Sequence, residues 1–117
     1  MVKIKRVYEE PDPRDGLRVL VDRLWPRGLS KERAGVDRWE KQFAPSCELR
    51  RWFGHDPEMW QEFQARYLVE LEGKREAVEE IAGLAKRQGV TLLFAASDAE
   101  RNNAVVLKEM IERSTDK

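Results

Sequence analysis

Two polar stretches each follow an apolar run, and together they hold the side chains best suited to binding a ligand. The first is "DRLWPRG", residues 22–28, and the second is "ASDAERNN", residues 96–103. Arginines supply full positive charges that suit a carboxylate or a phosphate, and helix amides add partial positive charge. We therefore expect an anion-binding pocket with an aromatic wall, lined by Asp22, Arg23, Trp25, Arg27, Ser97, Asp98, Asn102 and Asn103.

The same residue types also have purely structural uses. Asp22 and Arg23 can pair with neighbouring side chains, and Trp25 at the end of a strand can pack in the core. Ser97 and Glu100 have the spacing of a capping box, in which both side chains satisfy the first amides of a helix. Residue types alone leave both interpretations open, and they assign no catalytic residue.

Cys47 and His55 are the single cysteine and the single histidine of the chain. Cys47 follows an expected helix N-cap and precedes two arginines, an environment that favours a reactive thiolate, although simple packing is the commoner role. His55 lies in "GHDP", where it could act as a general acid or base or only pack in a turn. One Cys and one His are too few for a transition-metal site, and the chain has no P-loop or GxGxxG motif. We expect no metal and no cofactor.

The elements that must position these residues can be read from the periodicity of apolar residues. Residues 2–8 alternate apolar and basic side chains, which is typical of a half-buried strand near a sheet edge. Residues 18–24 form a second strand, and residues 90–96 are almost all apolar, as in a strand covered on both faces. Residues 36–44 fit a strand or a turn. Leu92, Leu93 and Phe94 are predicted to be buried.

Helices occupy most of the remaining chain. Ser30 is expected to cap a short helix that ends at Ala34, and Ser46 to cap a helix that ends at Phe53. Asp56 and Pro57 open a further helix, Gly73 separates it from a third, and that one ends at Gly89. The capping box at residues 97–100 predicts the last helix, whose buried face comprises Val106, Leu107, Met110 and Ile111.

The order of these elements predicts a single α/β domain over residues 1–117, with a mainly parallel sheet of about three strands flanked by helices. The segment between the second strand and residues 90–96 is long and rich in helices, which favours parallel pairing of those two strands. Ligands bind beyond the carboxyl ends of such strands. Both polar stretches are therefore expected to line one cleft.

Composition narrows the class of protein. Of the 117 residues, 41% are hydrophobic and 38% are charged, and no apolar run is long enough to span a bilayer or to form a signal peptide. We therefore expect a cytoplasmic protein. Residues 1–55 hold 13 Lys and Arg against 9 Asp and Glu, a net charge of +4 that could attract anions from phosphates to nucleic acid. An ordinary mixed surface would have the same composition.

Three functions remain open, and binding of a small anionic ligand, such as a nucleotide or a phosphorylated metabolite, is favoured. The alternative of a nucleic-acid-binding module rests on "ELRRWF" at residues 48–53, together with Arg38, Trp39 and Lys41. Those side chains could stack on and hold a single strand, or their aromatic rings could belong to the core. The third function is a protein-interaction domain without a ligand.

Three motifs in this order, "RVLVDRLWPRG", "APSCELRRWFGHDPEMWQEFQARYLVEL" and "VTLLFAASDAERNNAVVLKEM", resemble the YeaO-like family of small bacterial and archaeal proteins. The resemblance covers nearly the whole chain and implies a fold but no reaction, because the family is a domain of unknown function. A larger related group carries Cys and Cys-His-Arg in the last motif. This chain has Phe94 to Ser97 and Asn102-Asn103 instead, so the resemblance implies no thiol or metal chemistry.

Overall fold

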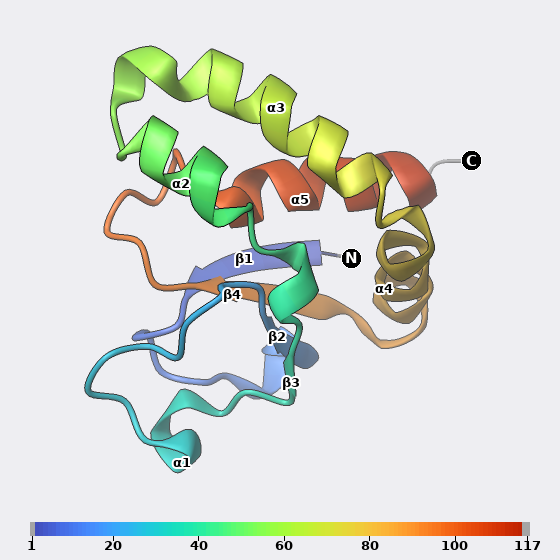
Figure 1. The fold of residues 1–117 in the computed structure, drawn as a ribbon. Helices are drawn as coiled ribbons and strands as arrows, with labels where there is room; N and C mark the ends of the chain where they lie inside the picture. The colour runs from blue at the N-terminus through green and yellow to red at the C-terminus, as the bar shows by residue number, and fades with distance from the viewer. Residues whose placement is uncertain (1, 116–117) are drawn as a thin grey trace.

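The computed structural model describes residues 2–115, and within them a four-stranded parallel sheet forms the centre of the fold. In chain order the strands are β1 (Val2–Arg6), β2 (Leu17–Leu20), β3 (Arg38–Trp39) and β4 (Val90–Phe94). Their order across the sheet is β1-β4-β2-β3, and every neighbouring pair is parallel (Figure 1). The predicted α/β class and the parallel pairing of β2 with β4 are confirmed.

The sheet has one strand more than the expected three. The pattern of residues 36–44 predicts a strand or a turn. The segment contains both, since the two-residue β3 is followed by a 3-10 turn at Lys41–Phe43. β2 is shorter than predicted. Its ladder ends where the Val21 amide donates to the Leu93 carbonyl over 3.2 Å, and the Asp22 side chain accepts from the amide of Ala95, the residue that follows β4. A side chain thus replaces the backbone ladder at the carboxyl edge.

Five α-helices surround the sheet: α1 (Lys31–Ala34), α2 (Cys47–Phe53), α3 (Trp60–Glu72), α4 (Arg75–Gln88) and α5 (Asn103–Thr115). Two of the expected N-caps are formed, since the hydroxyl of Ser30 accepts from the Arg33 amide and that of Ser46 from the Leu49 amide. Asp56 caps a 3-10 turn at Pro57–Met59, which leads directly into α3.

The predicted start of the last helix is wrong. α5 begins at Asn103, and residues 97–102 form bends instead of a capping box at Ser97. The reason is that the Asp98 carboxylate accepts from the Glu100 and Arg101 amides and so stabilises a turn. Asn102 is the residue that caps α5, because its side-chain oxygen accepts from the Val105 amide over 3.1 Å.

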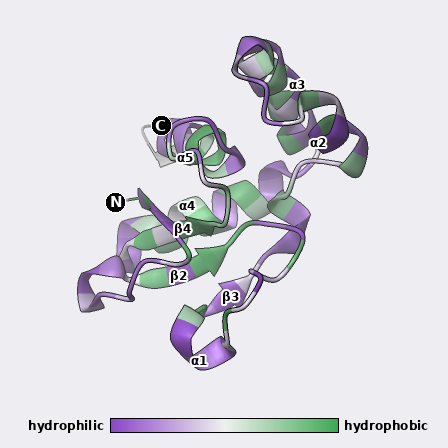
Figure 2. Cartoon of the chain, turned by 90° about the vertical axis from the view of Figure 1, so that its left-hand side faces the viewer, coloured by the Kyte–Doolittle hydropathy of each residue, from purple (hydrophilic) through white to green (hydrophobic). Residues whose placement is uncertain are grey.

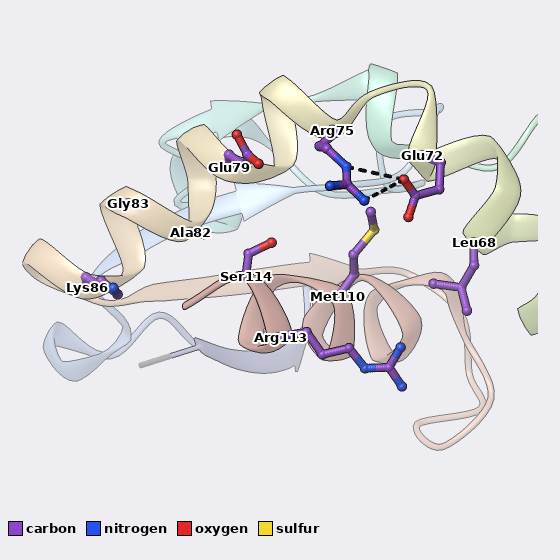
Figure 3. Close-up of a pocket in the computed structure, with 10 residues that line it drawn as sticks. All are labelled: Leu68, Glu72, Arg75, Glu79, Ala82, Gly83, Lys86, Met110, Arg113 and Ser114. Carbon is purple, nitrogen blue, oxygen red and sulfur yellow. Dashed lines mark hydrogen bonds and ion pairs between the residues drawn. The ribbon is translucent and has the colours of Figure 1, made fainter. Parts of the chain in front are cut away.

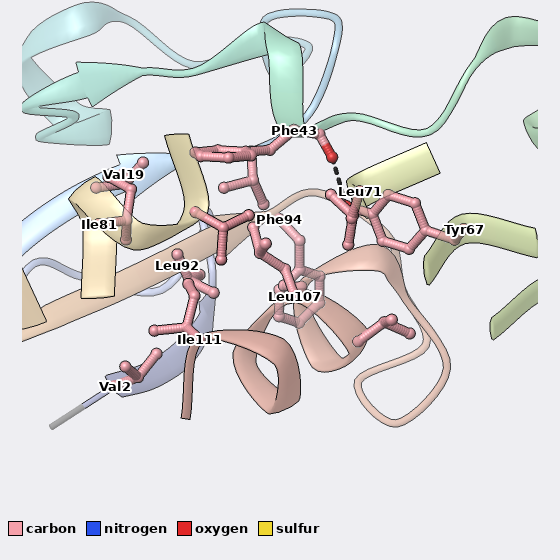
Figure 4. Close-up of a cluster of buried hydrophobic side chains, with 14 of the residues drawn as sticks. Val2, Val19, Phe43, Tyr67, Leu71, Ile81, Leu92, Phe94, Leu107 and Ile111 are labelled. Atoms are coloured by element: carbon pink, nitrogen blue, oxygen red, sulfur yellow. Dashed lines mark hydrogen bonds between the residues drawn. The ribbon is translucent and has the colours of Figure 1, made fainter. Parts of the chain in front are cut away.

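The main core lies between one face of the sheet and helices α2 to α5 (Figures 1 and 4). Leu92 and Phe94 point into it, while Leu93 points to the opposite face and packs with Val7 and Leu20 under α1. All three consecutive β4 residues are buried as predicted, and hydrophobic residues are concentrated in β2 and β4 (Figure 2). On α5, Met110 is only half-buried, whereas the other three residues of its predicted face are buried.

A buried ion pair holds the second face together. The Arg18 guanidinium donates to the Asp15 carboxylate and also to the carbonyls of Ala34 and Gly35, over 2.8 and 2.9 Å, at the end of α1. Asp15 and Arg18 are each 4% exposed. This pair therefore fastens the end of α1 and the 3-10 turn Pro13–Asp15 to β2.

No helix in the described part of the chain is long and apolar enough to cross a membrane.

Candidate functional site

A cavity of about 300 Å³ opens at the carboxyl ends of β2 and β4. The loop after β2, the helix α2, the loop after β4 and the beginning of α5 all contribute to its walls. Its lining residues are Tyr8, Asp22, Arg23, Leu24, Trp25, Pro26, Arg27, Ala44, Pro45, Arg50, Phe53, His55, Phe63, Ala95, Ala96, Arg101, Asn102 and Asn103.

Six of the eight residues predicted for the site line this cavity: Asp22, Arg23, Trp25, Arg27, Asn102 and Asn103. Ser97 and Asp98 do not. Ser97 is exposed, and the Asp98 carboxylate is taken up by its own turn and by an ion pair of 3.2 Å with Arg101. The parallel pairing of β2 with β4 brings the two polar stretches together. Because α5 begins at Asn103 and not after Ser97, Asn102 and Asn103 line the cavity and Ser97 does not.

Asp22 forms the polar floor of the cavity. Its carboxylate accepts from the Ala95 amide over 2.9 Å and from the Asn103 side-chain amide over 3.2 Å. Asn103 also donates to the Val21 carbonyl over 3.0 Å, which fixes its orientation. Burial raises the pKa of Asp22, and the two donors together with the nearby Arg50 charge oppose this rise only in part.

Four arginines surround this single acidic lining residue. A terminal N–H of the Arg23 guanidinium donates a hydrogen bond to the Pro45 carbonyl over 3.3 Å, while the buried Nε has no hydrogen-bond partner among the described residues. Arg27 and Arg50 are exposed, and within residues 2–115 neither guanidinium forms a hydrogen bond or an ion pair. Arg101 is shared with Asp98. The lining therefore carries excess positive charge and an unsatisfied buried donor.

Aromatic rings form the apolar walls. Trp25 is half-buried, donates its indole N–H to the Leu29 carbonyl over 2.6 Å, and meets Trp39 edge to face with ring centroids 5.4 Å apart. On the opposite side Phe53 stacks on Phe63 at 4.4 Å. Trp25 thus combines the two interpretations of its sequence, because it packs beneath the sheet and also lines the cavity.

Beneath the floor lies a buried tyrosine. Tyr67 donates its hydroxyl to the Phe43 carbonyl, and burial together with the Asp22 charge raises its pKa. Its hydroxyl is therefore neutral and serves to hold the segment before α2 against α3. That segment includes Pro45, the acceptor for Arg23.

Several lining residues escaped prediction from the sequence. Arg101 lies within the second polar stretch but is not among the predicted site residues, and Arg50 and Phe53 belong to a motif that suggests nucleic acid. Tyr8 lies two residues after the end of β1, so the expectation that ligands bind beyond the carboxyl ends of strands could have identified it. Finding Arg50, Phe53 and Phe63 requires knowledge of how α2 and α3 return over the edge of the sheet.

The two residues considered for other chemistry differ in position. His55 lines the mouth of the cavity, its ring 5.8 Å from that of Phe53, and its backbone has a φ of 59°. Cys47 is exposed and is not among the lining residues. Within the described residues, no three His, Cys, Asp or Glu side chains are grouped so that they could hold a metal ion.

A larger cavity of about 540 Å³ lies between α3, α4 and α5 (Figure 3). Two of its charged residues, Glu72 and Arg75, already pair with each other over 2.9 Å, and the others have both signs. None of the residues predicted for the site lies there, and no strand end reaches it. The smaller cavity at the carboxyl edge is therefore the better candidate.

Comparison with known proteins agrees with the resemblance that the three sequence motifs indicate over nearly the whole chain. The profile of a family described as the inactive DUF488-N3 subclade matches residues 1–117. Uncharacterized protein YeaO of Escherichia coli is 39% identical over 110 residues, which cover 94% of this chain and 96% of that protein. Uncharacterized protein Rv3073c of Mycobacterium tuberculosis is 44% identical over 110 residues, which cover 94% and 92%. No solved structure matches the chain significantly.

Proposed function

Because this chain belongs to the inactive DUF488-N3 subclade, which includes YeaO-like proteins, we propose that it binds a small anionic ligand at the carboxyl edge of its sheet without turning it over. The ligand class is a nucleotide or a phosphorylated metabolite. The observation that carries the proposal is the charge of the cavity, in which four arginines face one carboxylate and the buried Arg23 Nε has no partner among the described residues.

An anion would satisfy groups that the protein leaves unsatisfied. A phosphate near Arg23 would compensate the charge of a guanidinium whose buried Nε has no partner among the described residues. Arg27 and Arg50 stand at the same opening, and guanidinium groups suit the bidentate recognition of phosphate. A carboxylate ligand fits the same donors, so phosphorylated and carboxylated metabolites belong to one series of test compounds.

The walls favour a ligand that also has a flat, apolar part. Trp25, Phe53 and Phe63 supply aromatic surface beside the arginines, and a cavity of about 300 Å³ has room for one ring system with a phosphate. Nucleoside monophosphates combine both parts. Binding without reaction agrees with the word "inactive" in the family description.

Thermal stability in the presence of anions tests this proposal. We expect sulfate, phosphate or a nucleoside monophosphate to raise the melting temperature. At 100-fold excess over the dissociation constant, the ligand adds about 2.7 kcal/mol to the free energy of unfolding. Arg23→Ala should abolish the shift and leave the unliganded protein folded, because the truncated side chain is only half-buried. Differential scanning fluorimetry over a panel of anions measures both quantities.

Arg75→Ala is the matched control, since it removes an arginine from the other cavity. It should keep the full ligand-dependent shift. If no anion or nucleotide in the panel stabilises the native protein, or if both arginine variants lose the shift equally, the cavity at the sheet edge is not the binding site.

The affinity for a dianion should increase as the pH falls. Asp22 is the only acidic residue of the lining, and burial raises its pKa above the usual value, so it gains a proton earlier than an exposed aspartate on acidification. Protonation removes the one negative charge that repels an anion. We expect sulfate, which stays dianionic, to bind about tenfold more tightly once Asp22 is protonated than at neutral pH. Calorimetric titration measures this ratio.

Two variants separate the contributions to this pH dependence. Asp22→Asn has no charge to lose, so sulfate should bind it with little pH dependence. His55→Gln removes the only histidine of the lining while keeping Asp22. If the pH dependence survives in Asp22→Asn and disappears in His55→Gln, the histidine controls the affinity and the role given to Asp22 is wrong.

A further inference from the structure

We propose that the ligand of this cavity is one nucleotide of a single-stranded nucleic acid, whose neighbouring bases stack along the carboxyl edge of the sheet. This inference rests on the proposed function and specifies its ligand. It depends on three exposed residues, Tyr8, Leu24 and Trp39, which we call the rim. Tyr8 and Leu24 also line the cavity, and Trp39 contacts the lining residue Trp25.

The rim gathers most of the large apolar side chains that the described surface exposes. Tyr8 is 40% exposed, Leu24 64% and Trp39 37%, and the fourth such residue, Val69, lies on α3. Single exposed apolar residues need no explanation, whereas three around one cavity indicate a surface that another molecule covers. The exposed rings are held in place, because Tyr8 donates to the Arg27 carbonyl over 3.0 Å and Trp39 to the Asp22 carbonyl over 2.8 Å.

Strand order spreads the rim along a line. Tyr8 follows β1 at one edge of the sheet, Trp39 belongs to β3 at the other, and β4 and β2 with the cavity lie between them (Figure 1). Three strand spacings amount to roughly 14 Å. A stacked strand that rises about 3.4 Å per nucleotide covers this distance with about four nucleotides. A free mononucleotide would fill the cavity and leave Trp39 uncovered, because Trp39 does not line the cavity.

Positive charge accompanies the aromatic rings at both ends. The guanidinium of Arg6 lies 4.9 Å from the centre of the Tyr8 ring, and the ammonium of Lys41 lies 4.1 Å from the centre of the Trp39 ring. The guanidinium groups of Arg27 and Arg50, which are unpaired within residues 2–115, stand at the cavity between them. A repeating chain of bases and phosphates needs flat surfaces and cations in alternation, which is what single-strand binding sites supply. An acidic peptide would use the cations and leave the rings unexplained.

Isothermal titration calorimetry with unlabelled oligothymidylates, which do not pair with themselves, tests the inference. We expect the tetranucleotide to bind at least tenfold more tightly than thymidine 5′-monophosphate, and the octanucleotide to bind little more tightly per site than the tetranucleotide. Affinity for the tetranucleotide should also fall more steeply with added salt, because more phosphates are neutralised.

Rim variants separate the strand from the single nucleotide. Tyr8→Ala and Trp39→Ala should each weaken tetranucleotide binding by tenfold or more. Trp39→Ala should leave the monophosphate affinity and the sulfate-dependent melting shift unchanged, because Trp39 does not line the cavity. Trp39→Phe keeps a stacking ring and should retain most of the affinity. Val69→Ala removes an exposed apolar side chain away from the rim and should bind like the native protein.

Each opposite result has its own meaning. If the tetranucleotide binds no more tightly than the monophosphate while sulfate still stabilises the protein, the strand is overturned and the anion pocket stands. A tetraglutamate peptide that binds as tightly as the tetranucleotide would also overturn the stacking role of the rim. If neither the oligonucleotides nor sulfate bind, both proposals fall together.

Discussion

Replacing Arg18 by alanine should lower the free energy of unfolding by about 3–5 kcal/mol, because three buried acceptors each lose a charged donor while Lys5 stays paired with Asp15. Arg18 is 4% exposed and its guanidinium contacts the Asp15 carboxylate and two carbonyls at the end of α1. The variant leaves all three acceptors with fewer donors. Urea denaturation at neutral pH measures the loss.

Arg14→Ala is the control for this change. Arg14 also pairs with an aspartate, Asp12, but on the surface, so its loss should leave stability unchanged within the error of the measurement. A similar loss in both variants would show that general charge balance, and not the buried pair, stabilises the fold.

Acid titration gives an independent check on the same pair. Burial alone would raise the pKa of Asp15, but hydrogen bonds from the Asp12 amide, Lys5 and Arg18 outweigh it, so the pKa is lowered. A lowered pKa in the folded state stabilises the protein above the unfolded value of about 3.9, and this stability is lost as the pH falls through the folded pKa. The Arg18→Ala variant should therefore lose less stability on acidification than the native protein does.

Leu93→Ala should cost about 2–5 kcal/mol, the range for removing a buried leucine side chain. Leu93 is fully buried on the face of β4 opposite the main core, among Val7, Leu20 and Ala34. That cluster is small, so it has few neighbours that can move into the space. Leu24→Ala, which truncates a leucine that is 64% exposed, should change the unfolding midpoint little. A loss below about 1 kcal/mol for Leu93→Ala would show that α1 and its adjoining loops move in to fill the space left by the removed side chain.

The central features of the sheet could be predicted because they depend on local patterns. An apolar run without alternation predicted that β4 is buried on both faces, and a long helical segment predicted that β2 and β4 are parallel. The place of β1 could not be predicted. β1 and β2 do not pair with each other but flank β4, and nothing in residues 2–20 indicates that their common partner lies about 70 residues further along the chain.

In the candidate site, too, the residues close to strand ends in the sequence could be predicted, and the residues placed by tertiary packing could not. The rule of strand ends placed Asp22, Arg23 and Asn103 at one cavity, because these residues directly follow or lie close behind the strands. The error at Ser97 arose because the same spacing of polar residues suits a helix cap and a turn, and Asp98 forms the turn. Arg50 comes from a helix that crosses back over the edge of the sheet, a geometry set by tertiary packing.

The position of β4 has a consequence for how the protein is made. Among the strands of the described residues β4 is the last to be synthesised, yet within them it is the only partner of β1 and the main partner of β2. Until residue 94 has been synthesised, the nascent chain has two strands without their partner and four helices without the complete surface on which they pack. Folding of the sheet must therefore follow synthesis of most of the chain, and Lys3 and Lys5 on β1 help to keep that waiting edge from joining other chains.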